Sequence, residues 1–84
     1  MRSNRDMYEI TVPKMGMDTT EVEILKWMTK VGDNIKKGDP VAEIEFEKAT
    51  TEIESEVSGT VEEILCKEGD IVNVGSVIAR IKNN

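Results

Sequence analysis

Lys48 is the residue whose type and position best equip this sequence for chemistry. It lies between Glu47 and Ala49 in the segment EIEFEKATTEIE (43–54), a pattern typical of two strands joined by a tight turn. The central positions of such a turn normally hold glycine, asparagine or aspartate. A lysine there displays a primary amine, which can form an amide with a carboxylic acid. The turn alone leaves two interpretations open, a solvated hairpin tip or a site of covalent attachment.

The composition excludes most other catalytic arrangements. The sequence has no histidine and only one cysteine, Cys66, which removes nucleophile–histidine pairs and thiolate zinc sites. Neither the GxxxxGK nor the GxGxxG phosphate-binding pattern occurs. The carboxylates of Glu52, Glu54 and Glu56 alternate along the chain, as they do on the solvated face of a strand. We therefore expect no catalytic residue and no metal site.

The charge balance of the chain is acidic. Its 84 residues include 17 Asp and Glu against 11 Lys and Arg, for a net charge of −6. Such a surface repels phosphate backbones and anionic lipids, so neither nucleic acid nor a membrane is an expected partner. No segment has the pattern of a signal peptide or the ~20 apolar residues of a membrane span. We expect a cytoplasmic protein, or an organelle-matrix protein if the chain is a fragment of a larger precursor.

Short β-strands are the elements that must position Lys48. Runs of β-branched residues separated by Gly, Asp and Asn predict an all-β domain. The glycines, Gly59 among them, are predicted to lie between strands. Residues 1–6 are predicted to form a flexible tail, and residues 7–83 a single domain. The predicted strands cover residues 7–12, 22–28, 34–35, 41–46, 50–54, 57–66, 71–72 and 77–82.

An internal repeat divides the chain into two similar halves. The segment VGDNIKKGDPVAEIE at 31–45 matches EGDIVNVGSVIARIK at 68–82, and EITVPKMG at 9–16 matches EIESEVSG at 52–59. The first half carries about six extra residues at 17–22, by the difference between the two offsets. Two such halves predict a flattened β-sandwich or barrel of two roughly four-stranded sheets with pseudo-twofold symmetry. That symmetry places the turn at Lys48 at the end opposite to both chain termini.

Five segments occur in a specific order and spacing: VPKMGM at 12–17, ILKWMTKVGDNIKKGDPVAEIE at 24–45, EKAT at 47–50, SGTVEEILCKEGD at 58–70 and VGSVIARI at 74–81. Through these segments nearly the whole chain, from Tyr8 to Lys82, resembles the lipoyl domain family, the swinging-arm modules of 2-oxo acid and acetoin dehydrogenase complexes. The resemblance implies that Lys48 carries lipoate in amide linkage, with Glu47 and Ala49 as flanking recognition residues. It also implies a non-catalytic carrier, either free-standing or part of a dihydrolipoyl acyltransferase.

The resemblance further implies a set of partner enzymes. A lipoate-attaching enzyme modifies the lysine, and a thiamin-dependent decarboxylase, an acyltransferase core and a flavin dihydrolipoyl dehydrogenase then use the arm in turn. The domain would shuttle acyl groups and reducing equivalents between their active sites. The extra residues 17–22 would form a loop close to Lys48 where partner enzymes touch the domain. We expect the isolated domain to be monomeric. Pyruvate, 2-oxoglutarate, branched-chain and acetoin complexes all stay open as the parent.

The turn departs from the family pattern Glu-Thr-Asp-Lys-Ala, because Phe46 and Glu47 stand in place of Thr and Asp. Phe46 shares strand parity with Ala42 and Ile44, which favours a position against the core over a contact with a partner. Two alternatives to a lipoyl carrier remain. One is a biotin carboxyl carrier, whose usual pattern has Met on both sides of the lysine. The other is an unmodified β-sandwich interaction module.

Overall fold

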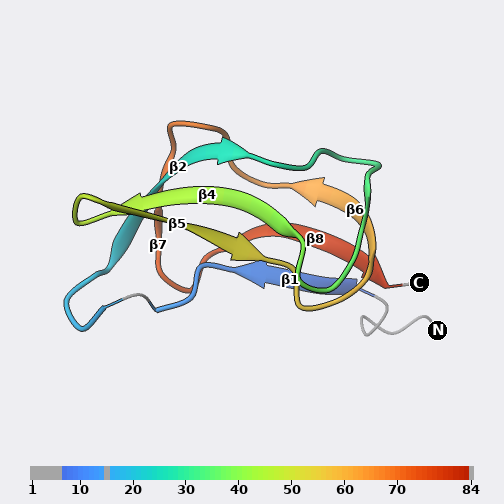
Figure 1. The fold of residues 1–84 in the computed structure, drawn as a ribbon, viewed down its shortest axis with the longest axis horizontal. Coiled ribbons are helices and arrows are strands. Elements are labelled where there is room, and N and C mark those ends of the chain that lie inside the picture. The colour runs from blue at the N-terminus through green and yellow to red at the C-terminus, as the bar shows by residue number, and fades with distance from the viewer. Residues whose placement is uncertain (1–6, 15, 84) are drawn as a thin grey trace.

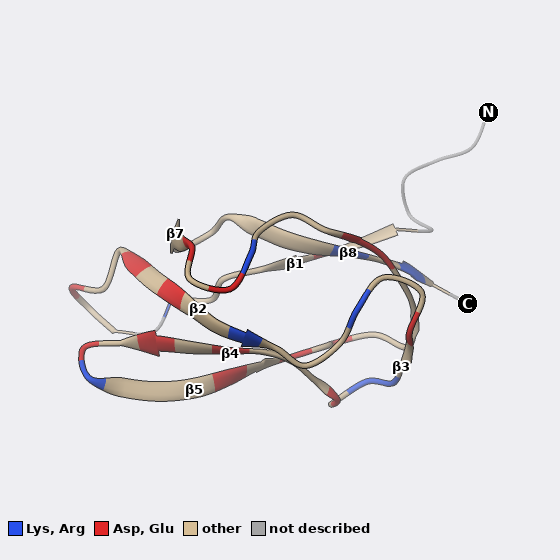
Figure 2. Ribbon diagram, turned by 90° about the horizontal axis from the view of Figure 1, so that it is seen from above, with Lys and Arg blue, Asp and Glu red and all other residues tan. Residues whose placement is uncertain are grey.

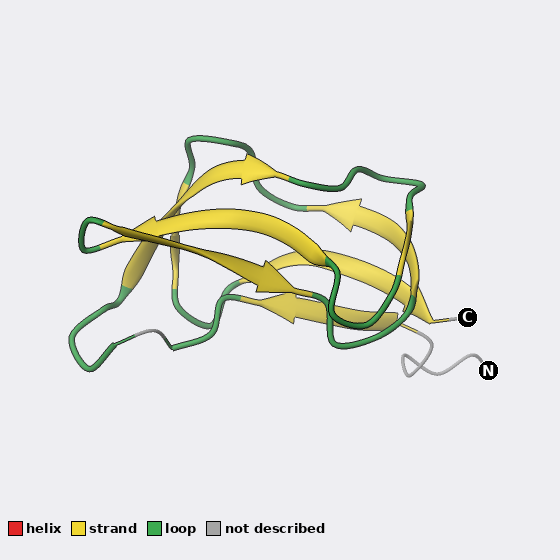
Figure 3. Cartoon of the chain, in the orientation of Figure 1, coloured by secondary structure: helices red, strands yellow, loops and turns green. Residues whose placement is uncertain are grey.

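The chain folds into two four-stranded antiparallel sheets, as seen in a computed structural model that describes residues 7–14 and 16–83 (Figure 1). One sheet has the order β1-β8-β6-β3 and the other β5-β4-β2-β7. The strands are β1 (Met7–Thr11), β2 (Glu21–Trp27), β3 (Asn34–Ile35), β4 (Pro40–Phe46), β5 (Ala49–Glu54), β6 (Gly59–Ile64), β7 (Ile71–Asn73) and β8 (Val77–Asn83). The described residues contain no helix (Figure 3), and hence none that could cross a bilayer. The predicted all-β sandwich is confirmed, whereas the predicted tail at 1–6 lies outside the described residues.

The two halves of the chain are structurally equivalent, as the repeat predicts. Exchanging β1 with β5, β2 with β6, β3 with β7 and β4 with β8 converts the strand order of one sheet into that of the other. The turns of the two halves are equivalent as well. Gly32 and Gly69 have φ angles of 97° and 93°, and their N–H groups donate to the carbonyls of Val61 and Ile24 respectively. Glycine takes such positive φ values without the steric penalty of a Cβ.

The core lies between the two sheets and consists of β-branched and small apolar side chains. Ile44 and Ile81 occupy equivalent positions in the two halves, and both are fully buried. Phe46 and Trp27 are half-buried and pack against this core, which confirms the position predicted for Phe46. The buried apolar residues are Ile10, Val12, Val22, Ile24, Ile35, Val41, Ala42, Ile44, Ile53, Val61, Ile78, Ala79 and Ile81.

The strand predicted at 57–66 is shorter in the structure, where β6 covers Gly59–Ile64. The buried hydroxyl of Ser55 donates to the carbonyl of Val57 at 2.6 Å, and this turn delays the start of the strand. Gly59 pairs with Asn83 inside the sheet, so the prediction that it lies between strands is wrong, whereas the predicted strand at 57–66 correctly includes it. A Cβ at Gly59 would collide with the carbonyl of Lys82, so the glycine permits β8 to approach closely. The other strands begin and end within one residue of their predicted bounds.

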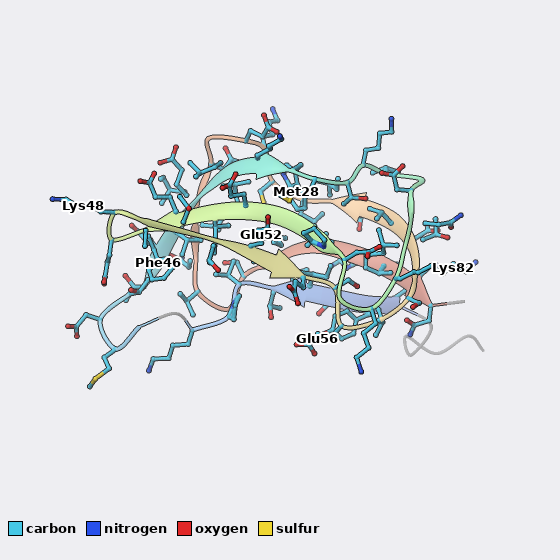
Figure 4. The ribbon with its side chains drawn as sticks, viewed as in Figure 1. Met28, Phe46, Lys48, Glu52, Glu56 and Lys82 are labelled. Carbon is cyan, nitrogen blue, oxygen red and sulfur yellow. The ribbon has the colours of Figure 1, made fainter. Side chains whose placement is uncertain are left out.

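The β4–β5 hairpin and the two ends of the described chain lie at opposite ends of the sandwich. Figure 1 shows the hairpin projecting at one end and the start of β1 beside the end of β8 at the other. Met7 pairs with Lys82 at that second end. The side chains of Lys48 and Lys82 accordingly appear at opposite ends of Figure 4. This arrangement confirms the placement predicted from the repeat.

Candidate functional site

The tip of the β4–β5 hairpin consists of two residues, Glu47 and Lys48. The pairing of Phe46 with Ala49 closes the ladder directly before them. Glu47 and Lys48 have φ angles of 50° and 67°, and they are the only non-glycine residues with positive φ in the described chain. Positive φ at both central positions defines a type I′ turn, which matches the right-handed twist of the flanking strands. The tight turn predicted around Glu47 and Lys48 is therefore confirmed.

Lys48 presents its amine to solvent at this tip. Its side chain is exposed and points away from the body of the domain (Figure 4). The structure gives the ammonium group no hydrogen bond or ion pair within the described residues. Glu47 and Ala49 on either side are also exposed, so an enzyme can approach the lysine together with both neighbours. The predicted site residues therefore share one accessible tip.

The loop between β1 and β2 lies against the hairpin tip. Thr19 is only 8% exposed, and its Oγ1 hydroxyl donates a hydrogen bond of 2.8 Å to Oε2 of Glu47. The proximity of this loop to Lys48, which the family resemblance implied, is confirmed. The contribution of Thr19 was not predicted, because a single threonine in a polar loop carries no periodic signal. The only clue in the sequence was that Thr19 falls in the six residues absent from the second half.

Acidic residues recur along β2, β4 and β5 of the sheet that carries the hairpin, as the red segments of the ribbon show (Figure 2). Glu23 lies opposite Glu45, and Glu43 lies opposite Glu52, on neighbouring strands. Like charges directly opposite one another destabilise a sheet. A shallow hollow of about 250 Å³ next to the lysine continues this negative surface. It is lined by Glu21, Val22, Glu23, Glu45, Glu47, Lys48 and Ile71. The surroundings of the lysine are thus complementary to a basic protein surface.

Cys66 lies apart from the hairpin, just after β6, and is half-buried. Its partial burial, reinforced by the negative charge of Asp70, raises the pKa of the thiol. The thiol therefore stays protonated near neutral pH and is a poor nucleophile. The part of the chain that the structure describes contains no cluster of Cys, Asp and Glu arranged to hold a metal ion.

Together, the symmetric sandwich and the lysine at its free hairpin define the class of protein: a biotinyl- or lipoyl-type carrier domain. The chain belongs to the biotin/lipoyl family, and its residues 8–81 match the family described as "Biotin-requiring enzyme". The match covers every strand except the first residue of β1 and the last residues of β8.

The curated relatives of the chain include components of one enzyme complex. Over 74 residues the chain is 45% identical to the dihydrolipoyllysine-residue acetyltransferase component of the pyruvate dehydrogenase complex of Staphylococcus aureus. It is 46% identical to the protein of the same name from Staphylococcus epidermidis. These alignments include 88% of this chain but only 17% of either relative. The chain thus spans about a sixth of the length of the proteins that it matches.

Solved structures share the fold. The lipoyl domain of the 2-oxoglutarate dehydrogenase complex from Azotobacter vinelandii superposes with a TM-score of 0.74 at 25% identity, covering 89% of this chain and 95% of that domain. Urea carboxylase from Kluyveromyces lactis matches with a TM-score of 0.78 at 28% identity, covering 96% of this chain and 7% of the enzyme. The sandwich therefore recurs both as an isolated lipoyl domain and inside a much larger enzyme.

Proposed function

We propose that this domain carries lipoate on Lys48 and shuttles acyl groups and reducing equivalents between the active sites of a 2-oxo acid dehydrogenase complex. The observation that carries the proposal is the exposed amine of Lys48 at a two-residue turn, at the end opposite to the described chain ends. The 45% identity to a dihydrolipoyllysine-residue acetyltransferase component supports lipoate as the attached group.

The residues at the tip fit a covalently attached acid. Lys48 offers a primary amine that no described neighbour engages. Its Nζ can attack a lipoyl group that the attaching enzyme has activated, and the activating group and a proton leave as the amide forms. Lipoate, once attached, supplies a dithiolane that accepts acyl groups and electrons. The chain's own contribution is to hold the attachment point on a tight hairpin, at the end of the domain opposite to the described chain ends. Tethering of this kind raises the local concentration of the arm at each active site.

The domain itself is proposed to be a carrier, with catalysis supplied by its partners. The relatives that are named acetyltransferase components are about five times as long as this chain, so the chain matches only a module of them. The proposed partners are a lipoate-attaching enzyme, a thiamin-dependent decarboxylase, the acyltransferase core and a flavin dihydrolipoyl dehydrogenase. The same relatives favour a pyruvate dehydrogenase complex as the parent assembly.

A biotinyl carrier is the second candidate, because the family as a whole includes biotin-requiring enzymes. The flanks of the lysine argue against it, since Glu47 and Ala49 stand where the biotin pattern has Met. The two candidates differ in the group that is attached, not in the fold or in the attachment point.

Mass spectrometry of the protein from its native cell tests the proposal. We expect a lipoyl group on Lys48, and no modification of a Lys48→Arg variant that folds normally. Modification converts an ammonium into a neutral amide, so the net charge changes from −6 to −7 and the protein migrates as a more acidic species. Lys37→Arg is a matched control, because Lys37 is also exposed but lies outside the hairpin. Lipoate on the Lys48→Arg protein would refute the attachment site, and biotin on Lys48 would favour the second candidate.

A further inference from the structure

Thr19 occupies an unusual position for a threonine in a surface loop. Its neighbours Asp18 and Thr20 are exposed, yet Thr19 is buried. Gly16 lies beneath it, and a Cβ at Gly16 would stand only 3.2 Å from the Thr19 hydroxyl. Burial of a hydroxyl is costly unless it makes a hydrogen bond. Thr19 satisfies that requirement through the bond to Glu47.

The loop that holds Thr19 is itself anchored to the sandwich at both ends. At its start, the N–H of Val12 donates to the carbonyl of Ser76, and the N–H of Gly75 donates to the carbonyl of Val12. At its end, the N–H of Val74 donates to the carbonyl of Thr20 at 2.9 Å. These three backbone bonds connect the loop to the turn between β7 and β8. The Thr19 hydroxyl is therefore a donor held in place by the rest of the domain.

In contrast to the anchored loop, the hairpin tip extends beyond the last strand pairing. Beyond the pairing of Phe46 with Ala49, Glu47 and Lys48 project past the ladder, in a conformation that is unfavourable for residues with a Cβ. The bond from Thr19 to Glu47 is the side-chain hydrogen bond by which the described loop holds this tip. Glu47 stands where the family pattern has the shorter Asp, and its longer side chain spans the distance to the Thr19 hydroxyl.

We propose that Thr19 is a positioning residue for Lys48. By holding the Glu47 carboxylate, it restrains the turn so that the amine is presented in one orientation to the lipoate-attaching enzyme. The inference rests on the proposed function of Lys48 as the attachment site. A restrained turn loses less conformational freedom on binding. The effect is therefore expected in the KM for the domain, while kcat stays unchanged.

The experiment uses the unmodified domain and three variants. Thr19→Val removes the hydroxyl and keeps the shape, and Thr19→Ser restores the hydroxyl. Thr20→Val is the matched control, because it makes the same substitution one residue away at an exposed side chain. Two quantities are measured, ¹⁵N relaxation of the Lys48 amide and the kinetics of lipoylation with purified attaching enzyme. The first reports on the turn without any attached group.

For Thr19→Val we expect increased mobility of the Lys48 amide on the picosecond to nanosecond timescale, with other amides unchanged. We also expect KM for the domain to rise about fivefold, the factor that one hydrogen bond of ordinary net strength supplies. Thr19→Ser should restore both values, and Thr20→Val should leave both unchanged. Unchanged Lys48 relaxation and KM in Thr19→Val would overturn the proposal, and so would an equal effect of Thr20→Val. If the wild-type domain accepts no lipoate on Lys48, the proposed function fails instead, and the relaxation data still show whether Thr19 restrains the turn.

Discussion

The folded domain would be more stable with glycine at position 48 than with a residue that has a side chain. The φ of 67° at Lys48 places this residue at the second central position of a type I′ turn, where glycine is the preferred residue. A residue with a Cβ loses about 1–2 kcal/mol in this conformation. Glycine avoids this cost. Its greater conformational freedom in the unfolded chain, however, offsets about 0.4–1 kcal/mol of the stability gained. We therefore predict that Lys48→Gly is about 1 kcal/mol more stable than Lys48→Ala, which removes the same exposed side chain but keeps the Cβ.

Thermal unfolding followed by circular dichroism measures this difference. For a domain of this size, 1 kcal/mol corresponds to a rise of about 4–8 °C in Tm. Lys37 provides the matched control, because it is an exposed lysine whose φ is not positive. There the order should reverse, with Lys37→Gly less stable than Lys37→Ala. Equal stabilities of Lys48→Gly and Lys48→Ala would refute the claim that the turn is strained at Lys48. Both Lys48 variants should fail to accept lipoate, so function at this position is maintained at the expense of stability.

Two further predictions follow from the core and from the cysteine. Ile81 is fully buried, so Ile81→Ala should reduce the free energy of unfolding by about 2–5 kcal/mol in urea titrations, whereas Ile71→Ala at a 59% exposed position should change it by less than about 0.5 kcal/mol. The raised pKa of Cys66 means that the folded state binds more protons than the unfolded state once pH exceeds the ordinary thiol value of 9.0. The stabilisation is thus complete below that value and is lost as pH rises through the folded pKa. The urea midpoint should accordingly fall more between pH 8 and pH 10 in the wild type than in Cys66→Ser, and equal falls would contradict the shift.

Strand positions and symmetry were predictable because they depend on periodic signals. Alternating apolar residues and turn glycines recur at a fixed offset, and backbone equivalence of the two halves follows from that recurrence. Gly59 was assigned wrongly for a physical reason. A turn glycine and a glycine that admits a neighbouring strand look the same in sequence, and only the position of the Lys82 carbonyl distinguishes them. The start of β6 was missed because it depends on a local bond of the Ser55 hydroxyl.

The candidate site was predictable only in part. The position of Lys48 at a two-residue turn follows from the strands on either side, since register fixes what lies at the tip. The bond between Thr19 and Glu47 joins residues 28 positions apart through side chains alone. No repeat or periodicity encodes such a contact. The sequence alone does not explain why Glu47 replaces the shorter Asp. The structure does, because it places the Thr19 hydroxyl within hydrogen-bond distance of the longer side chain.

The site lies where the symmetry of the fold is broken. In the first half, β4 continues through the hairpin into β5, whereas the described residues contain no hairpin after its counterpart β8, so the turn at Lys48 has no symmetric equivalent among them. The connection between β1 and β2 is likewise longer than the turn at residues 55–58 that corresponds to it in the second half. These two departures from the repeat are in contact with each other through Thr19 and Glu47. The rest of the sandwich has the same strand arrangement in both halves. The attachment site occurs once in the described chain, and the Thr19–Glu47 hydrogen bond joins the two asymmetric segments that form it.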